Sequence, residues 1–396
     1  MKILFYRYGS ICEPDVIDAF KKNNITVDEM TDEVTDKTLT AREVVERLSA
    51  CLLEHPCDFV FSINFFPPVS EVCRIHGILY LSWSVDCPVL ELYAQAVKNK
   101  INRIFLFDRA QWADINRLNP DHTYHLPLAA NPGHKRNVIR KATSEQKKRY
   151  RADVCFVGSL YTEKSPYDRL EMKNMPDRVK GYIDGIMRAQ EEVYGYYFID
   201  ELLGDDLVKE FTAHCGNFYP EYSTMGRETF LKDRDLLSLF YIGNKITANE
   251  RMRYMTYLSG HTDVTIYTAS DTSSISRLKN KGTINTLTQM PIAFHESKIN
   301  LNMSSKAIRT GLPFRIFDVL SCGGFLLTNY QEELAENFEP GRELAVYGSR
   351  EELLDLINYY IPREDERMKI AQAGMERLEA EHTFEKRVGQ MLKMAL

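Results

Sequence analysis

Residues 297–329 constrain the fold of this chain more than any other segment. They contain an apolar strand at 298–303, a glycine-containing loop, a short helix with an apolar face and a second strand at 325–328. Pro313 stands in the first helical turn and Gly323 just beyond the last turn, the positions that these residues prefer. Two strands joined by a helix in this way are parallel, and the start of such a helix commonly binds phosphate.

The same alternation of strand and helix runs through the rest of the sequence. Short apolar strands separated by helices indicate parallel sheets with helices on both faces. Because 396 residues exceed the usual size of one core, we predict an α/β chain with two Rossmann-like, doubly wound domains facing a cleft. The first domain is expected over residues 1–150 and the second over 151–375, with a helical insertion at about 166–259. A final helix is expected within 376–396.

Apolar patterns place the individual elements. Strands are predicted in the first domain at 2–6, 58–64, 78–82, 103–107 and 124–126, and in the second at 153–157, 264–267, near 282–285, 298–303, 325–328 and near 344–347. Thr40 with Glu43, and Ser349 with Glu352, have the spacing of capping boxes and predict two helix starts. Residues 91–98 are also predicted to be helical. The basic residues 135–151 are predicted to form a solvated linker, and a phosphate-binding surface is the alternative.

Composition excludes several classes of protein. The formal net charge of −6 argues against a nucleic-acid partner. No apolar run reaches the length of a membrane span, and the N-terminal residues have the pattern of a strand and not of a signal peptide, so a cytoplasmic protein is expected. Eight cysteines stand singly and are interpreted as reduced core residues. The absence of a Walker loop and of the three-glycine dinucleotide fingerprint disfavours a kinase, an ATPase or a nicotinamide dehydrogenase.

Candidate chemistry begins in the helix that follows Gly311. Arg315 and Asp318 lie three residues apart and share one face of that helix. Arg315 is a candidate for binding a diphosphate, because its guanidinium matches phosphate oxygens bidentately, and Asp318 is a candidate for ribose hydroxyls. The alternative is an intrahelical ion pair with no role in binding.

Three further loops follow strands and carry candidate residues. Gly158 and Ser159 end one strand and precede Lys164, a combination that suits a phosphate but also an ordinary turn. Asp86, in the loop WSVDCP, is a candidate general base, the alternative being a capping carboxylate. Equivalent strand ends in the first domain carry Tyr8, Gly9 and Asn64. The nine histidines show no metal pattern, and His125 and His295 are interpreted as structural, with catalysis as the alternative.

The sequence resembles a known family at this point. SKINLNMSS, RTGLPFRIFDVLSCGGFLLTNYQEEL and IAQAGMERLEAEHTFEKRV are similar to the C-terminal half of spore-maturation-type (CgeB-like) bacterial glycosyltransferases, which are related to glycosyltransferases group 1 and have the GT-B fold. DFVFSINFFPPVSEVC, GILYLSWSVDCP and HLPLAANP are similar to their N-terminal domain. The resemblance covers nearly the whole chain.

The resemblance implies the transfer of a hexosyl group from a nucleotide-diphosphate sugar, with a UDP-sugar as co-substrate and no other cofactor. Gly158, Ser159 and Lys164 would contact the diphosphate, Asn302 would line the donor site, and the last helix would cross back to the first domain. In related retaining enzymes two glutamates flank seven residues. Here Thr310 and Asp318 occupy those positions, so the resemblance implies a retaining enzyme but leaves an inverting outcome open.

The expected function is therefore a metal-independent glycosyltransferase. The donor would occupy the second domain at Gly158, Ser159, Lys164, Asn302, Thr310, Gly311, Arg315 and Asp318, and the acceptor, a cell-surface, spore or protein glycan, would lie against Tyr8, Gly9, Asn64 and Asp86. Asp86 and Arg315 are the predicted catalytic residues, and two side-chain cations with a helix dipole would replace a metal ion. A nucleotide-sugar epimerase and a non-catalytic nucleotide- or sugar-binding protein are the alternatives.

Overall fold

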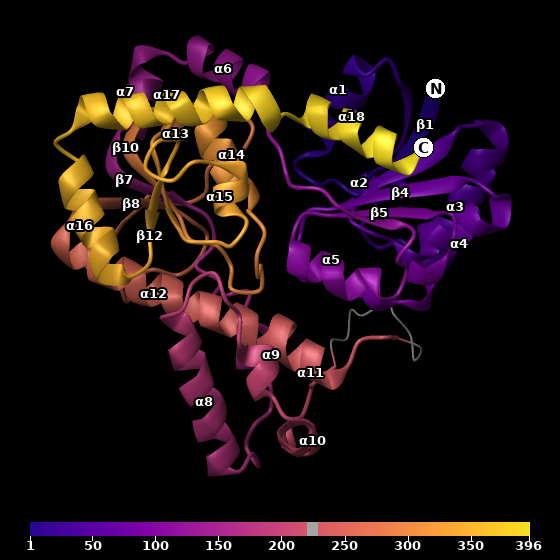
Figure 1. The fold of residues 1–396 in the computed structure, drawn as a ribbon, viewed down its shortest axis with the longest axis horizontal. Helices are drawn as coiled ribbons and strands as arrows, with labels where there is room; N and C mark the ends of the chain where they lie inside the picture. Colours follow the sequence, from indigo (N-terminus) through magenta and orange to yellow (C-terminus); the bar gives the residue numbers. More distant parts are fainter. Residues whose placement is uncertain (220–228) are drawn as a thin grey trace. The chain divides into compact units, whose positions relative to one another are not determined.

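The computed structural model describes residues 1–219 and 229–396, which form two compact units (Figure 1). Unit 1 comprises Met1–Leu128, Tyr219–Leu231 and Thr383–Leu396, and unit 2 comprises Ala129–Phe218 and Lys232–His382. Unit 2 begins at Ala129. The first boundary between the units therefore lies ahead of the basic residues 135–151, and not near residue 150 as the sequence pattern predicts. The sequence pattern also gives no sign that Tyr219–Leu231 belongs with the first unit.

Unit 1 is built on a parallel sheet of six strands. Its strand order is β2-β1-β3-β4-β5-β6, and every neighbouring pair is parallel. The strands are β1 (Lys2–Tyr6), β2 (Thr26–Met30), β3 (Phe59–Ile63), β4 (Leu79–Ser84), β5 (Asn102–Leu106) and β6 (Thr123–His125). All five residues of β3 are buried, as expected of a strand covered on both faces.

Helices and short helical turns complete unit 1: α1 (Glu13–Lys22), α2 (Asp32–Thr35), α3 (Ala41–Glu54), α4 (Pro67–His76), η1 (Leu90–Tyr93), η2 (Gln95–Lys98), α5 (Arg109–Asn116) and α18 (Phe384–Ala395). The predicted capping box at Thr40 and Glu43 is confirmed by both of its hydrogen bonds at the start of α3. The C-terminal helix α18 packs beside α1 (Figure 1), where the Asn23 amide donates to the Glu385 carbonyl at 3.0 Å.

Unit 2 contains a second parallel sheet of six strands in the order β12-β11-β10-β7-β8-β9. The strands are β7 (Ala152–Val157), β8 (Val264–Tyr267), β9 (Lys279–Asn280), β10 (Ser297–Asn302), β11 (Leu326–Asn329) and β12 (Ala345–Tyr347). Because β7 pairs with β10 on one side and with β8 on the other, the chain builds this sheet outward in two directions.

The helices of unit 2 cover this sheet and extend from it. They are α6 (Pro132–Lys141), α7 (Ser144–Tyr150), η3 (Pro166–Arg169), α8 (Asp177–Glu191), α9 (Ile199–Leu202), α10 (Asp205–His214), α11 (Asp233–Asp235), the π-helical η4 (Leu236–Ile242), α12 (Gly243–His261), α13 (Met290–Glu296), α14 (Phe314–Ser321), α15 (Leu334–Asn337), α16 (Arg350–Tyr360) and α17 (Glu364–Glu381). The elements from η3 to α12 occupy the predicted helical insertion, of which residues 220–228 lie outside the described residues.

Three local predictions are wrong. Strand β2 was not expected, because its sequence TVDEM has only one buried side chain. Residues 91–98 form two short 3-10 helices interrupted at Ala94, whose backbone is extended. The strand expected at 282–285 lies instead at β9, because Gly282 has φ +74° and the Asn285 side chain accepts from the Leu287 and Thr288 amides in a turn.

The basic residues 135–151 are not a solvated linker. They form parts of α6 and α7, whose starts are capped by the side chains of Asn131 and Thr143. Lys135 is only 4% exposed and its ammonium lies 3.3 Å from the Asp318 carboxylate. A buried ion pair explains why this part of a basic run is fixed against the second sheet.

Among the described residues, no helix is both long and apolar enough to span a bilayer. Each of the eight cysteines is a free thiol, as expected from their single spacing. Each unit has a core of its own: one cluster joins β1, β3, β4 and β5, and another joins β7, β8, β10 and β11 with α12 and α16.

Two helical glycines give opposite expectations for the same substitution. A Cβ at Gly374 in α17 would overlap the backbone carbonyl of Glu343, whereas a Cβ at Gly185 in α8 would meet open space. We expect Gly374→Ala to lower the free energy of unfolding by about 1–3 kcal/mol through overpacking. Gly185→Ala should raise it by up to about 1 kcal/mol, since alanine favours helices. Calorimetry checks both; an equal effect of the two substitutions would contradict this packing of α17.

Candidate functional site

Each sheet has one switch point. There the chain, having added strands on one side of the first strand, begins to add strands on its other side. In unit 1 it lies between β1 and β3, and in unit 2 between β7 and β10. Ligands of open parallel sheets bind at the carboxyl ends of the strands beside such a point, because the two connecting loops diverge there. The predicted site residues fall at these two places, one set in each unit.

The loop after β7 is held by a shared carboxylate. The Ser159 hydroxyl donates to Glu163 at 2.7 Å, and the Ser270 hydroxyl, from the loop after β8, donates to the same carboxylate at 2.8 Å. Burial works to raise the pKa of Glu163, but these hydrogen bonds outweigh it and lower that pKa below its ordinary value. Lys164, which is exposed, has its ammonium 5.6 Å from the centre of the Tyr161 ring.

The end of β10 is a buried polar junction. The Asn302 amide donates to Thr328 at 2.9 Å and to Ser304 at 3.1 Å, and the Tyr347 hydroxyl donates to the Asn302 carbonyl at 3.1 Å. Asn302 is 3% exposed. Its side chain therefore fixes the relative position of the loops after β10 and β11, and both of its amide hydrogens are already engaged by protein oxygens.

The loop that leads into α14 carries Thr310 and Gly311. The Thr310 hydroxyl donates to the carboxylate of Glu333 at 2.7 Å, and the Glu333 amide donates back to the Thr310 carbonyl at 3.2 Å. The Gly311 carbonyl accepts from Gln331 at 3.1 Å. Sequence spacing alone could not identify Glu333, because it lies 23 residues from Thr310 on the loop after β11. The buried carboxylate of Glu333 thus lies beside Thr310, the residue that the resemblance aligns with the first glutamate of the related retaining enzymes.

Arg315 and Asp318 form the intrahelical ion pair that was the alternative to a binding role, with 3.4 Å between nitrogen and oxygen. Asp318 also receives Lys135 at 3.3 Å. The Arg315 guanidinium lies 2.7 Å from the Met290 sulfur and 5.1 Å from the centre of the Phe294 ring. The charges of Arg315 and Asp318 are therefore partly compensated by other groups of the protein, although neither side chain is fully buried.

One cation at the switch point of unit 2 was not singled out by the sequence. Arg251, from α12, donates to the Ser159 carbonyl at 2.7 Å and to the Met303 carbonyl, so that its guanidinium spans the ends of β7 and β10. It is 8% exposed. Burial lowers the pKa of Arg251; among its neighbours Tyr161 and Glu250 act to raise that pKa, and the charge of Arg315 acts to lower it. The unit-2 site therefore has a positive electrostatic character that extends beyond Lys164 and Arg315.

In unit 1 the structure brings three predicted residues together. The Asn64 amide donates to the Tyr8 hydroxyl at 2.9 Å and to the Asp86 carboxylate at 2.8 Å. Asp86 is exposed at the end of β4. Burial, and to a lesser degree the charge of Asp86, raises the pKa of Tyr8, so its phenol remains a proton donor at neutral pH.

Two carboxyl groups near the cluster of Tyr8, Asn64 and Asp86 were not identified from the sequence. Glu13, fully buried, accepts from the Tyr8 and Gly9 amides at 3.0 Å each and pairs with Arg7. It therefore shapes the turn in which Gly9 has φ +95°. Burial raises the pKa of Glu91, and the charge of Asp86 adds to the shift. The His125 and His295 rings each approach a backbone carbonyl, at 3.3 and 3.0 Å, which agrees with their structural interpretation.

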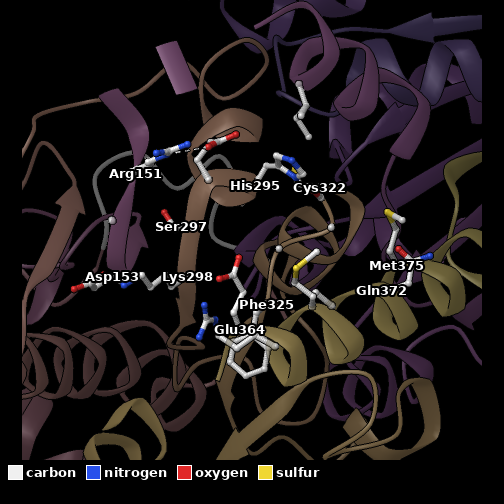
Figure 2. A pocket seen from close by; sticks show the side chains of 18 of the residues that line it. Arg151, Asp153, His295, Ser297, Lys298, Cys322, Phe325, Glu364, Gln372 and Met375 are labelled. Carbon is white, nitrogen blue, oxygen red and sulfur yellow. Dashed lines mark hydrogen bonds and ion pairs between the residues drawn. The ribbon is translucent and has the colours of Figure 1, made fainter. Parts of the chain in front are cut away.

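A cavity of about 1400 Å³ lies elsewhere in unit 2, at the amino ends of the strands. Figure 2 shows Arg151, Asp153, Ser297 and Lys298 on one side of it and Gln372 and Met375 of α17 on the other. Several of its charged groups form ion pairs, Lys298 with Asp153 at 2.8 Å and Lys279 with Asp263 at 2.9 Å. Because it occupies the edge opposite Gly158 and Asn302, we do not assign the predicted ligand to this cavity.

Within residues 1–219 and 229–396, no three histidine, cysteine, aspartate or glutamate side chains are placed to hold a metal ion. The site of unit 2 combines the carboxylates of Glu163, Asp318 and Glu333 with cations, amides and hydroxyls, and the cations suit an anionic ligand.

Comparison with known proteins agrees with this geometry. The sequence model of the family described as "Glycosyl transferase-like" matches residues 250–393. No curated protein matches the chain in sequence. Among solved structures the chain is similar to Anabaena HepE in complex with UDP and glucose, with 12% identity, a TM-score of 0.52 and coverage of 99% of this chain and 98% of that chain.

Two further structures are similar over whole chains. Sucrose-phosphate synthase from Thermosynechococcus elongatus has a TM-score of 0.58 at 9% identity, covering 100% of this chain and 98% of that chain. A UDP-forming trehalose-phosphate synthase from Burkholderia xenovorans has a TM-score of 0.53 at 10% identity, with the same coverage. The fold is therefore that of GT-B glycosyltransferases, which confirms the predicted α/β class with two Rossmann-like domains.

The Glu163 carboxylate makes the loop after β7 sensitive to acid. Its pKa is lowered in the folded chain, so its contribution to stability is complete above about pH 5 and is lost as the pH falls through the folded pKa. We expect the melting temperature of the wild type to fall by about 1–2 °C more than that of Glu163→Gln between about pH 5 and pH 3, a small effect because the group is exposed.

Calorimetry at each pH measures this difference. Glu332→Gln, which removes an exposed carboxylate from the loop after β11, is the matched control. If the Glu163→Gln and Glu332→Gln curves coincide, the serine–carboxylate arrangement after β7 is not maintained in solution.

Proposed function

We propose that this chain is a glycosyltransferase that transfers a sugar from a nucleotide-diphosphate sugar, with UDP-glucose or a similar UDP-sugar as donor, to the hydroxyl of a glycan or protein acceptor. The observation that carries the proposal is the cationic switch point of unit 2, much of which lies within the glycosyl transferase-like segment 250–393. The GT-B fold and the UDP-containing HepE structure support this choice of donor. The epimerase alternative has no support from the family model or from the structures named above.

The donor would bind in unit 2. Lys164 and Arg315 would neutralise the diphosphate, together with the amide end of α14, whose dipole favours an anion. Asp318, held by Lys135 and Arg315, would accept from ribose hydroxyls. Gly158 would let the backbone approach a phosphate. Charge stabilisation by these groups would serve in place of a divalent ion.

The acceptor would bind in unit 1. Asp86 is exposed and hydrogen-bonded to Asn64, and its carboxylate would accept the proton of an incoming hydroxyl. Tyr8, whose phenol stays protonated, would donate a hydrogen bond to the acceptor. In the reaction the anomeric C–O bond to the diphosphate breaks with its electron pair on the leaving oxygen, the acceptor oxygen bonds to the same carbon on the face that the diphosphate leaves, and its proton passes to the base.

We further propose that the enzyme belongs to the spore-maturation-type branch, retains the anomeric configuration and works in the cytoplasm on a cell-surface, spore or protein glycan. The resemblance of SKINLNMSS and RTGLPFRIFDVLSCGGFLLTN supports the branch. Thr310 with Glu333 behind it supports a donor subsite in which a hydroxyl replaces the first acidic side chain.

Donor binding is testable by thermal shift. A ligand at 100 times its Kd should stabilise the native state by about 2.7 kcal/mol, raising Tm by several degrees, because it binds only the folded chain. We expect UDP and UDP-glucose to raise Tm and uridine to do so much less. Lys164→Ala should weaken UDP binding about tenfold, whereas Lys209→Ala, an exposed lysine of α10, should not change it.

Product analysis separates the remaining alternatives. Incubation with UDP-glucose should release UDP slowly by transfer to water, and faster with an acceptor. An altered sugar still attached to UDP would indicate an epimerase, and binding without UDP release over a broad acceptor panel would indicate a non-catalytic protein. If no nucleoside diphosphate changes Tm, the proposal is wrong.

A further inference from the structure

Arg251 is a buried cation at the point where the second sheet changes direction. Its guanidinium donates to carbonyls of the loops after β7 and β10, Ser159 at 2.7 Å and Met303. These are the two strands that flank the switch point of unit 2. The group therefore lies beneath the position at which a ligand of this sheet would sit.

Arg251 has no ion-pair partner among the described residues. Within the described parts of the chain, no carboxylate oxygen lies within 4.0 Å of its guanidinium nitrogens. Its Nε is buried and has no hydrogen-bond partner there. Burying an ion without a counter-charge costs several kcal/mol, so such a group usually faces an anion. The faces of Tyr161 at 4.7 Å and Phe156 at 5.6 Å compensate only part of this cost.

The carboxylate next to Arg251 in the sequence is engaged elsewhere. Glu250 is 1% exposed, and its Oε1 lies 3.1 Å from the Lys306 ammonium and accepts from the Tyr194 hydroxyl at 2.5 Å. Lys306 is itself 7% exposed. This pair forms a closed, neutral contact between α12 and the loop after β10, so Glu250 acts on Arg251 through space and not as an ion-pair partner.

Two further cations, Lys164 and Arg315, lie near Arg251. The Tyr161 ring lies between two cations, with Arg251 at 4.7 Å and the Lys164 ammonium at 5.6 Å from its centre. The charge of Arg315 lies close enough to lower the pKa of Arg251. Three cations from three different segments therefore act on the same region, and among the residues that the structure describes only Arg315 of the three has a carboxylate partner at ion-pair distance.

We propose that Arg251 binds the diphosphate of the donor, contacting a phosphate oxygen through a terminal nitrogen while its other N–H groups hold the two strand-end loops. The inference rests on the proposed function and assigns to α12 a binding residue that sequence spacing did not reveal. Arg251 is thus the buried counter-ion of the leaving group, and Lys164 is the exposed one.

Isothermal titration of UDP, inorganic pyrophosphate and uridine into variants tests this assignment. Arg251→Met should weaken UDP and pyrophosphate binding at least about tenfold and uridine binding little, because only the phosphate contact is lost. Arg251→Lys, which keeps one charge, should fall between Met and wild type. Arg253→Lys is the matched control on the same helix, where Arg253 pairs with Glu191 at 3.0 Å.

The outcomes separate this inference from the proposed function. If the wild type binds neither UDP nor another nucleoside diphosphate, the proposed function fails. If the wild type binds UDP and the Arg251 variants bind it equally well, Arg251 has only a structural role. The same holds if the variants lose affinity for uridine by the same factor as for UDP. A crystal structure of the wild type with UDP is independent of how any variant folds: a phosphate oxygen at hydrogen-bond distance from Arg251 supports the inference, and a diphosphate bound away from it overturns it.

Discussion

Parallel strand pairing is the constraint on which both units depend. A parallel neighbour can be reached only through a crossover, and in each sheet the crossovers add strands on both sides of the first strand, which is β1 in unit 1, one strand from the edge, and β7 in unit 2. Each start leaves one pair of adjacent strands whose loops turn away from each other. The polar clusters of Tyr8, Asn64 and Asp86 and of Arg251 with Ser159 and Met303 occupy these two positions.

In unit 2 the helical insertion contributes to this position as well as to the core. Helix α12 packs Tyr254, Met255 and Leu258 against the sheet, and on the same helix it places Glu250 and Arg251 at the strand ends. One of these charges is neutralised by Lys306 and the other is not. A single helix thus combines apolar packing, a neutral polar contact that holds the loop after β10, and a cation whose charge is left for a ligand.

Local sequence signals predicted most of the fold. The strands with long buried runs were found, because continuous apolar residues are typical of parallel sheets, while β2 was missed because its residues are largely exposed at a sheet edge. The site residues were harder to predict from the sequence. Arg251 stands on the apolar stripe formed with 254, 255 and 258, which is the signal that could have identified it. The contacts of Asp318 with Lys135 and of Thr310 with Glu333 join distant segments, so no local spacing encodes them.

The position of α18 has a consequence for biosynthesis. This helix belongs to unit 1, where the Phe384 ring lies 5.9 Å from that of Trp83 and the Ala395 carbonyl accepts from Arg103 at 3.1 Å. The strands of unit 1 leave the ribosome long before α18 does. At about 5–20 residues per second, the intervening chain takes on the order of tens of seconds to be made. The apolar surface that α18 covers in unit 1 therefore stays exposed until this helix has been made. The unit whose strands are translated first is completed last.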